Sequence, residues 1–388
     1  MNSKLAVKSE PRIDLSYLST LGIKRYGHNN LYPNDCLKVV RNSATGDSCL
    51  GRYIKFIKGS GLYDPALSEL VVNRKGDTLG DITGLLAYDI ATFGGFAVHV
   101  NYNVFGQVVE LQHVPFENCR LCEADADGQV NRIAVHPDWT GKTTRDGKRV
   151  SVSRENVDYI DTFLPDQGVV ASQIEDAGGI ENYKGQVLYV SLFGRNVYPL
   201  TKYDDVLTEM VTDEGISDLK NRDVCSGFFP AGVFVVKKGQ GVTIGDEDFD
   251  EEQEDSGDNE FVHNFQSMQG AKNAQRAMVY FIGEDDEVPQ FVRIQGANYD
   301  KTFEATEKSV TERIYASFGQ EAFYRIRSGS LGFSSDIIQD VYSLYASLVT
   351  EEQGLIAGAL RKAMGNWFFE VDLKGLFIKP LDYITVKE

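Results

Sequence analysis

The sequence predicts an α+β fold, and three observations lead to this prediction. Segments with apolar residues at helical spacing alternate with short apolar runs that glycine, asparagine and aspartate interrupt. One turn-rich motif, Asn103–Gly106, lies between two apolar runs and predicts a β-hairpin. The stretch from residue 203 to 364 then follows an unusual order: helix, strand, acidic run, strand, helix, basic loop and long helix. At 388 residues the chain is long enough to form two or three lobes.

The N-terminal third mixes helices with short strands. Two short amphipathic helices are expected first, and the second, over 48–58, should end at the glycines of Gly59-Ser60-Gly61. Another helix is expected over 79–93, because Gly94-Gly95 would stop it there. The hairpin should pair residues 96–100 with 108–112. Further short strands are predicted over 159–163 and 186–191.

Two helices enclose the middle of the chain. The first is expected over 203–222 and the second over 299–318, with apolar strands at 228–236 and 277–282 between them. The second helix repeats apolar residues in one narrow stripe, which suits a helix packed sideways against other helices: Tyr299, Phe303, Val310, Ile314 and Phe318. A long closing helix should start at Ser335-Asp336, a good N-terminal cap. Its apolar positions predict that it lies on a core: Ile337, Val341, Leu344, Leu348, Leu355 and Leu360.

Composition excludes several classes of protein. The net charge of −18 argues against tight, non-specific nucleic-acid binding, although an acidic wall would let DNA slide past. No apolar run reaches the length of a membrane span, and the N-terminus has no apolar core of a signal peptide. The five cysteines have no regular spacing, which favours reduced thiols over a disulfide framework. A cytoplasmic site of synthesis is expected.

Most candidate chemical motifs are incomplete. Cys119-Arg120-Leu121-Cys122 lacks a second ligand pair for zinc, and in a strand the two thiols would face opposite sides. The acidic run 246–260 begins like a calcium loop, but Glu251 stands where glycine is needed and Gly257 where glutamate is needed. We expect the run to be a solvated loop. The histidines are scattered singly, and no nucleotide-binding or hydrolase motif occurs.

The best nucleic-acid candidate is the basic loop after the second of these helices. Arg325 and Arg327 follow Phe323 and Tyr324 and precede a segment rich in glycine and serine. Guanidinium groups on such a loop can contact phosphates in many geometries without reading bases. The competing interpretation is a pair of ordinary surface or intersubunit arginines.

The order of elements resembles the portal proteins of tailed bacteriophages, of the HK97-like type and especially those of Bacteroidetes phages. Short motifs support the resemblance along most of the chain: Tyr26–Pro33, Gly59–Leu62, Asn196–Pro199 and Gly270–Ala274. Two features depart from the family. Gln320-Glu321 stands where many relatives have a proline, and the C-terminal segment 367–388 is too short for a long helical crown.

The resemblance implies a division of the chain into parts. These are a wing (1–202), a first stem helix (203–226), a clip (227–292), a second stem helix (293–319), a tunnel loop (320–334) and a closing wing helix with a C-terminal segment (335–388). In the tunnel loop, Arg325, Arg327, Ser328 and Ser330 would contact DNA. Lys301 and Lys308 of the second stem helix would face the channel.

The resemblance also implies a function without catalysis. Twelve copies would form a ring at one capsid vertex, in the virion after assembly in the host cytoplasm, and conduct double-stranded DNA during packaging and ejection. The implied partners are the major capsid protein, the large terminase subunit and a head-tail adaptor protein, with no membrane, cofactor or metal. Two alternatives stay open: a hydrolase or nuclease with a convergent site, and a ring scaffold of a mobile element without a capsid.

Overall fold

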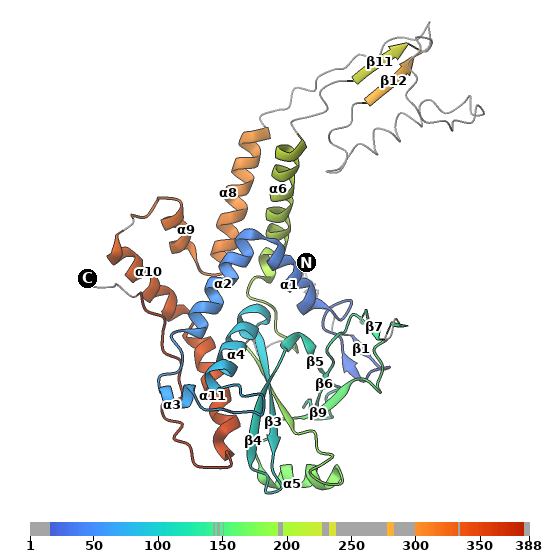
Figure 1. Ribbon diagram of the computed structural model, residues 1–388, viewed down its shortest axis with the longest axis vertical. Helices are drawn as coiled ribbons and strands as arrows, with labels where there is room; N and C mark the ends of the chain where they lie inside the picture. The colour runs from blue at the N-terminus through green and yellow to red at the C-terminus, as the bar shows by residue number, and fades with distance from the viewer. Residues whose placement is uncertain are drawn as a thin grey trace, which may run out of the picture. The chain divides into compact units, whose positions relative to one another are not determined.

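The computed structural model describes residues 16–142, 144–145, 148–149, 151–192, 197–226, 233–237, 278–282, 299–332 and 334–383. The side chains of 144–145, 148–149, 222–226, 233–237, 278–282 and 299–302 are not described. The acidic run 246–260 and the motif Gly270–Ala274 lie outside the described residues. The elements follow an α+β order, as the sequence predicts (Figure 1). Contacts divide the chain into unit 1, Met1–Val211 with Val310–Glu388, and unit 2, Thr212–Ser309.

A six-stranded mixed sheet forms the centre of unit 1. Its strands are β3 (Gly95–Tyr102), β4 (Val108–Val114), β5 (Cys119–Leu121), β6 (Arg132–Val135), β9 (Asp158–Thr162) and β10 (Gln186–Ser191). They lie in the order β4-β3-β10-β9-β6-β5, and only β9 and β10 pair in parallel. The predicted hairpin is confirmed as β3 and β4, which pair Val100 with Leu111. The strands expected over 159–163 and 186–191 are β9 and β10.

Helices of unit 1 bury their apolar faces against this sheet and against one another. They are α1 (Tyr32–Asn42), α2 (Ala44–Lys58), α3 (Pro65–Ser68), α4 (Leu79–Phe93), α5 (Gln167–Asp176), α9 (Glu321–Arg327), α10 (Ser335–Leu348) and α11 (Thr350–Ala363). Helix α4 contacts β3 and β4, and α11 contacts both β10 and α4. The main core joins all these layers, with Leu86, Val98 and Leu360 fully buried in it. The sheet and the C-terminal helices therefore share one core.

Local chemistry explains where α4 begins and ends. Thr78 and Asp81 form a reciprocal capping box, which satisfies free backbone amides in the first turn. Gly94 closes the helix with a φ of 78°, in the left-handed region. A Cβ at Gly94 would lie 2.6 Å from the carbonyl oxygen of Leu200, so only glycine fits there. The predicted boundaries of this helix, 79–93, are confirmed.

The remaining elements of unit 1 are short. They are β1 (Tyr17–Leu18), β2 (Ile23–Lys24), β7 (Thr144–Arg145), β8 (Lys148–Arg149) and the 3₁₀ turns Phe116–Asn118, Asp204–Val206 and Met364–Asn366. The β1–β2 and β7–β8 pairs are two-stranded and antiparallel. A small separate core includes Ile23, Cys122 and Trp139.

Unit 2 contains parts of two long helices and a strand pair. Helix α6 (Leu207–Ser226) and helix α8 (Tyr299–Ser317) both cross the boundary between the units. Within unit 2 the ammonium group of Lys220 pairs with the carboxylate of Glu307 at 2.5 Å, which joins the two helices. Strands β11 (Val233–Lys237) and β12 (Met278–Ile282) pair in parallel, Val233 opposite Met278. The strands and helices predicted for this stretch are thus present among the described residues.

The single long closing helix of the prediction is wrong. The structure has two helices, α10 and α11, separated at Val349, whose φ of −104° and ψ of 9° depart from helical values. Val349 is fully buried, so burial of its side chain accompanies the break. The predicted apolar stripe divides as well: Leu360 is buried in the core, whereas Leu344 and Leu348 are 56% and 51% exposed. None of the described helices is long and apolar enough to cross a membrane.

Candidate functional site

The predicted tunnel loop, about fifteen residues long, contains a helix. Gly319, with a φ of 66°, and Gln320 form a tight turn after α8, and α9 follows directly. The predicted loop over 320–334 is therefore wrong for the first half of the segment, where α9 forms. Aromatic packing is the physical reason, because the ring of Phe323 lies 5.4 Å from that of Tyr345 and 5.9 Å from that of Phe56. Between α9 and α10 the structure describes residues 328–332 and 334, and these are not helical.

The two arginines of this segment are both exposed, but they differ in their contacts. The guanidinium group of Arg327 donates a hydrogen bond to the hydroxyl of Tyr315, at 3.3 Å. This hydrogen bond raises the pKa of Arg327. Arg325 is exposed, and its side chain has no hydrogen bond or ion pair with any residue that the structure describes. The sequence gives no reason to distinguish the two arginines, whereas in the fold only Arg327 has a side-chain hydrogen bond to a described residue.

The two serines stabilise the turn after α9. The hydroxyl of Ser328 donates to the carbonyl oxygen of Arg325 at 3.2 Å, and it lies 2.9 Å from the hydroxyl of Ser330. The backbone amide of Leu331 also donates to the carbonyl oxygen of Arg325. These contacts leave both serines exposed at the surface beside Arg325.

Sequence reasoning missed two residues that hold α9. Gln320 is fully buried and donates hydrogen bonds to the carbonyl oxygen of Cys49 (2.9 Å) and to the hydroxyl of Tyr345 (2.8 Å). Arg52 of α2 donates to the side-chain oxygen of Gln320, and its guanidinium carbon lies 4.8 Å from the ring centre of Phe323. The sequence signal for Gln320 is that Gln320-Glu321 stands where many members of the family that the chain resembles have a proline. No sequence signal marked Arg52.

The predicted channel-facing lysines lie on α8. Lys308 is exposed, and the side chain of Lys301 lies outside the described set. The apolar stripe of α8 is buried only toward its C-terminal end, where Val310, Ile314 and Phe318 join the main core. Phe303 is 37% exposed. Within one subunit the described part of the stripe is therefore only partly buried.

Two of the motifs that carry the family resemblance meet in space. Tyr26 stacks on Tyr198 with ring centres 4.1 Å apart and 9° between the planes. The hydroxyl of Tyr26 donates to the carbonyl oxygen of Pro199. The hydroxyl of Tyr198 accepts from the amide of Leu121 (2.7 Å) and donates to the carbonyl oxygen of Lys24 (2.8 Å). The motifs therefore tie the start of the fold to the sheet edge at β5.

A fully buried arginine completes this junction. Arg120 of β5 donates to the side-chain and backbone oxygens of Asn30 and to the carbonyl oxygens of Glu117 and Cys119. Its guanidinium carbon lies 5.1 Å from the ring centre of Trp139. No carboxylate among the described residues pairs with it, and burial lowers its pKa. Its contacts are all internal, so we assign Arg120 a structural role.

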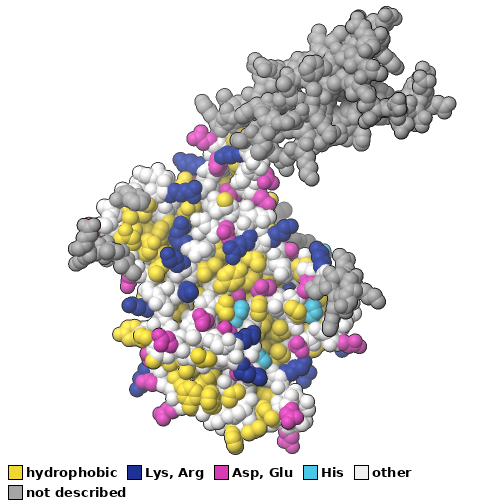
Figure 2. Space-filling view, viewed as in Figure 1, with side chains coloured by type: hydrophobic (Ala, Val, Ile, Leu, Met, Phe, Trp, Pro, Cys, Tyr) yellow, Lys and Arg dark blue, Asp and Glu magenta, His cyan; other side chains and the backbone are white. Residues whose placement is uncertain are grey.

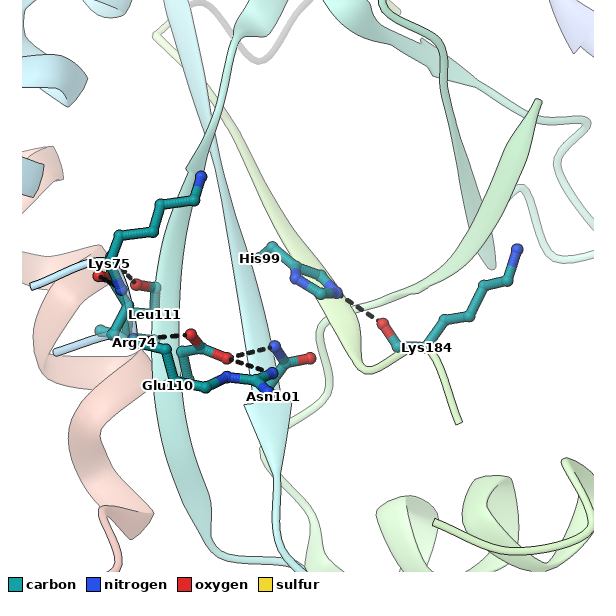
Figure 3. Close-up of polar contacts among 8 residues, drawn as sticks. Arg74, Lys75, His99, Asn101, Glu110, Leu111 and Lys184 are labelled. Atoms are coloured by element: carbon teal, nitrogen blue, oxygen red, sulfur yellow. Dashed lines mark hydrogen bonds and ion pairs between the residues drawn. The ribbon is translucent and has the colours of Figure 1, made fainter. Parts of the chain in front are cut away.

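A cleft of about 590 Å³ lies beside a second polar cluster. Glu110 of β4 accepts hydrogen bonds from the backbone amide of Arg74 (3.0 Å), the guanidinium of Arg74 (3.3 Å) and the amide of Asn101 (2.9 Å), as Figure 3 shows. Burial opposes ionisation, but these hydrogen bonds and one from Gln112 lower the pKa of Glu110 to about 2. The carboxylate is saturated by its own neighbours. The cluster therefore stabilises the turn at residues 73–77 against the sheet edge.

His99 and His113 have partners within the fold. In Figure 3 a ring nitrogen of His99 lies 2.6 Å from the carbonyl oxygen of Lys184. His113 lies 2.7 Å from the carboxylate of Asp89, and burial raises the pKa of Asp89 to about 6 although His113 opposes the rise. The interpretation of both histidines as structural agrees with these contacts.

The lone CxxC motif has no metal-site geometry. Cys119 is buried in a cluster with Phe93 and Phe116, whereas Cys122 lies in the small core with Ile23 and Trp139, so the two thiols face different cores. Burial raises the pKa of Cys122 to about 11. Over the described part of the chain, no group of three or more His, Cys, Asp or Glu side chains could hold a metal ion. The calcium-like loop lies outside the described residues.

On one face of the molecule, charge is dispersed over unit 1. On the face that Figure 2 shows, Lys and Arg side chains alternate with acidic and hydrophobic ones and do not gather into one basic surface. This face therefore carries no continuous basic surface of the kind that binds nucleic acid non-specifically.

Comparisons with known proteins give only loose similarity. No protein-family model and no curated protein matches the chain. A solved structure of the neck of an empty GTA particle contains a similar chain, with 14% identity, a TM-score of 0.48 and coverage of 86% of this chain and 82% of that one. The virion of a native gene transfer agent (GTA) particle (16%, TM-score 0.43) and the neck of a native GTA particle (15%, 0.43) match over the same shares. With every TM-score below 0.5, these matches establish no family.

Proposed function

We propose that this chain is a portal protein of the tailed-phage type, a ring-forming conduit for double-stranded DNA and a platform for head-tail connector proteins. The order of elements is the observation that carries the proposal. A strand pair, β11 and β12, is inserted between two long helices, α6 and α8, and a short basic helix, α9, follows directly. This order matches stem, clip, stem and tunnel segment.

The stem helices support assembly into a ring. Within unit 1, Arg313 of α8 pairs with Glu209 of α6 at 2.5 Å, and within unit 2 Lys220 pairs with Glu307. Large apolar side chains of these helices nevertheless remain exposed, with Val211 at 51% and Leu219 at 37%. Contacts with neighbouring copies around an axis would remove this apolar surface from water.

The proposal includes roles for the remaining predicted residues. Arg325 with Ser328 and Ser330 would contact phosphates from the tunnel segment, and Lys301 and Lys308 would face the channel. Weak, salt-screened contacts suit DNA that must move. The ring would sit at the capsid vertex, with the major capsid protein, the large terminase subunit and a head-tail adaptor as partners. No cofactor and no catalytic residue is part of the proposal.

Imaging of the purified full-length chain tests the ring. Mass photometry and negative-stain images should show closed rings of about a dozen copies, the number that the family resemblance implies. The double variant Val211→Ser with Leu219→Ser should shift the population toward folded monomers, because both exposed apolar contacts are lost. Val104→Ser is the matched control, since Val104 is 66% exposed but lies in the β3–β4 turn. A wild-type chain that stays a monodisperse monomer at high concentration would refute the proposal.

A further inference from the structure

We propose that the two arginines of α9 have different roles: Arg325 is the DNA-contact residue, whereas Arg327 is a positioning residue that works with Arg52 and Gln320. Together these three hold α9 against the body of unit 1. The contact role rests on the proposed function. The positioning role stands on the geometry of the subunit alone.

The first step is the anchor at the start of α9. Gln320 is 0% exposed and uses both ends of its amide. Its nitrogen donates to Cys49 of α2 and to the hydroxyl of Tyr345 of α10, and its oxygen accepts from Arg52. Tyr345 in turn donates to the carbonyl oxygen of Phe318 at the end of α8. One buried amide therefore connects α2, α8 and α10 at the point where α9 begins, and an unpaired amide there would be costly.

The second step is a guanidinium stacked between two helices. The guanidinium carbon of Arg52 lies 4.8 Å from the ring centre of Phe323 in α9 and 5.7 Å from that of Tyr315 in α8. Such cation–π contacts attract the guanidinium group to the ring face, and the attraction is stronger where the group is partly desolvated. Arg52 is half-buried, and its hydrogen bond to Gln320 orients the plane of its guanidinium group. Arg52 thus holds the first turn of α9 against the end of α8.

The third step is the anchor at the end of α9. Arg327 donates to the hydroxyl of Tyr315, whose side chain is 2% exposed and cannot move independently of the core. The ring of Tyr315 also lies 5.4 Å from that of Tyr324. Tyr315 therefore contacts Arg52 of α2 through its ring and Arg327 through its hydroxyl, and it holds the C-terminal end of α9 directly.

The fourth step concerns the arginine that remains. Arg325 is exposed, and its guanidinium has no partner among the residues that the structure describes, so all five of its N–H donors are available. Its backbone oxygen accepts from the hydroxyl of Ser328 and the amide of Leu331, and these hydrogen bonds stabilise the turn after α9. A planar fork on a fixed helix can pair with a phosphate at a lower entropy cost than a fork on a mobile loop.

Two measurements on the assembled full-length protein separate the roles. Hydrogen–deuterium exchange over residues 321–331 reports how firmly α9 is held, and fluorescence anisotropy with a short DNA duplex at low salt reports DNA association. The variant Tyr315→Phe removes the hydroxyl that Arg327 uses and changes no charge. Its exchange over α9 should be about 3–10-fold faster, the equivalent of one lost hydrogen bond. Arg52→Gln should raise exchange in the same segment.

The contact role has its own variant and its own control. Arg325→Gln should leave exchange over α9 unchanged, weaken DNA association and lower the slope of log K against log salt. Arg132→Gln removes an equal charge from an exposed residue of β6 and should change neither measurement. Unchanged exchange in both Tyr315→Phe and Arg52→Gln would overturn the positioning role, whatever the DNA result. Unchanged DNA association in Arg325→Gln would overturn the contact role. If exchange is also faster in Tyr315→Phe, the positioning role is still supported.

Discussion

Replacing Arg120 by methionine tests whether the buried junction at β5 holds unit 1 together. Methionine keeps most of the apolar stem and removes the guanidinium group, which is fully buried and has no carboxylate partner among the described residues. The carbonyl oxygens of Asn30, Glu117 and Cys119 would lose their charged donor. The side-chain oxygen of Asn30 would keep the backbone amide of Tyr26, at 3.0 Å.

The magnitude follows from these contacts. Two or three buried acceptors without a donor cost about 1 kcal/mol each or more, and the lost stacking on Trp139 and Tyr26 adds about 1 kcal/mol. Relief of the desolvation cost of the guanidinium offsets part of this sum. We expect a net loss of about 3 kcal/mol, which corresponds to about 5 °C in the melting temperature of a unit of this size.

Thermal unfolding followed by near-UV circular dichroism measures the effect, with Arg132→Met as the control. Arg132 lies in the neighbouring strand β6, is 65% exposed and pairs with Asp161, so its loss should cost less than about 1 kcal/mol. Arg120→Lys should recover little, because one ammonium cannot reproduce the planar fork that reaches three carbonyl groups. An Arg120→Met protein that melts within about 1 °C of the control would refute the assignment of Arg120 as the centre of the junction.

Three further predictions concern charge. Hydrogen bonding lowers the pKa of Glu110 from 4.5 to about 2, so its stabilisation is present above pH 4.5 and is lost as the pH falls through about 2. Glu110→Gln should lower the free energy of unfolding by about 2 kcal/mol at neutral pH. This is less than the pKa shift alone would give, because the partner Arg74 is 88% exposed and solvent screens the pair. Urea titrations should show that the difference between variant and wild type vanishes near pH 2. Burial raises the pKa of Asp89 from 3.8 to about 6, so its contribution is complete below pH 3.8 and is lost as the pH rises through about 6. Relative to Asp89→Asn, the wild type should lose stability over this window, and parallel urea titration curves would contradict the buried-acid interpretation. Deletion of 246–260, a run of carboxylates that repel one another, should leave rings intact in mass photometry, and insoluble protein would contradict this expectation.

The sequence by itself determined the elements whose boundaries are local. The helix at 79–93 has a capping threonine before it and glycine after it, and the strand at 186–191 is a short apolar run bounded by polar residues. The hairpin follows from the turn at Asn103–Gly106, where the side chain of Asn103 accepts from the amides of Phe105 and Gln107. The order of helix, strand, strand and helix from residue 203 onward was also visible, because each element carries its own apolar pattern.

Tertiary structure alone decided the elements that depend on distant contacts. Helix α5 has one buried residue, Val170, and therefore no stripe to recognise. Helix α9 is seven residues long and lacks a side-chain cap, so it is too short to be stable by itself and depends on Phe323 and on the anchors at both of its ends. The different contacts of Arg325 and Arg327 have the same origin. Local sequence propensity cannot distinguish two arginines in one helical turn. The position of Tyr315 on another helix decides that the guanidinium group of Arg327 has a hydrogen-bond partner, whereas that of Arg325 has none among the described residues.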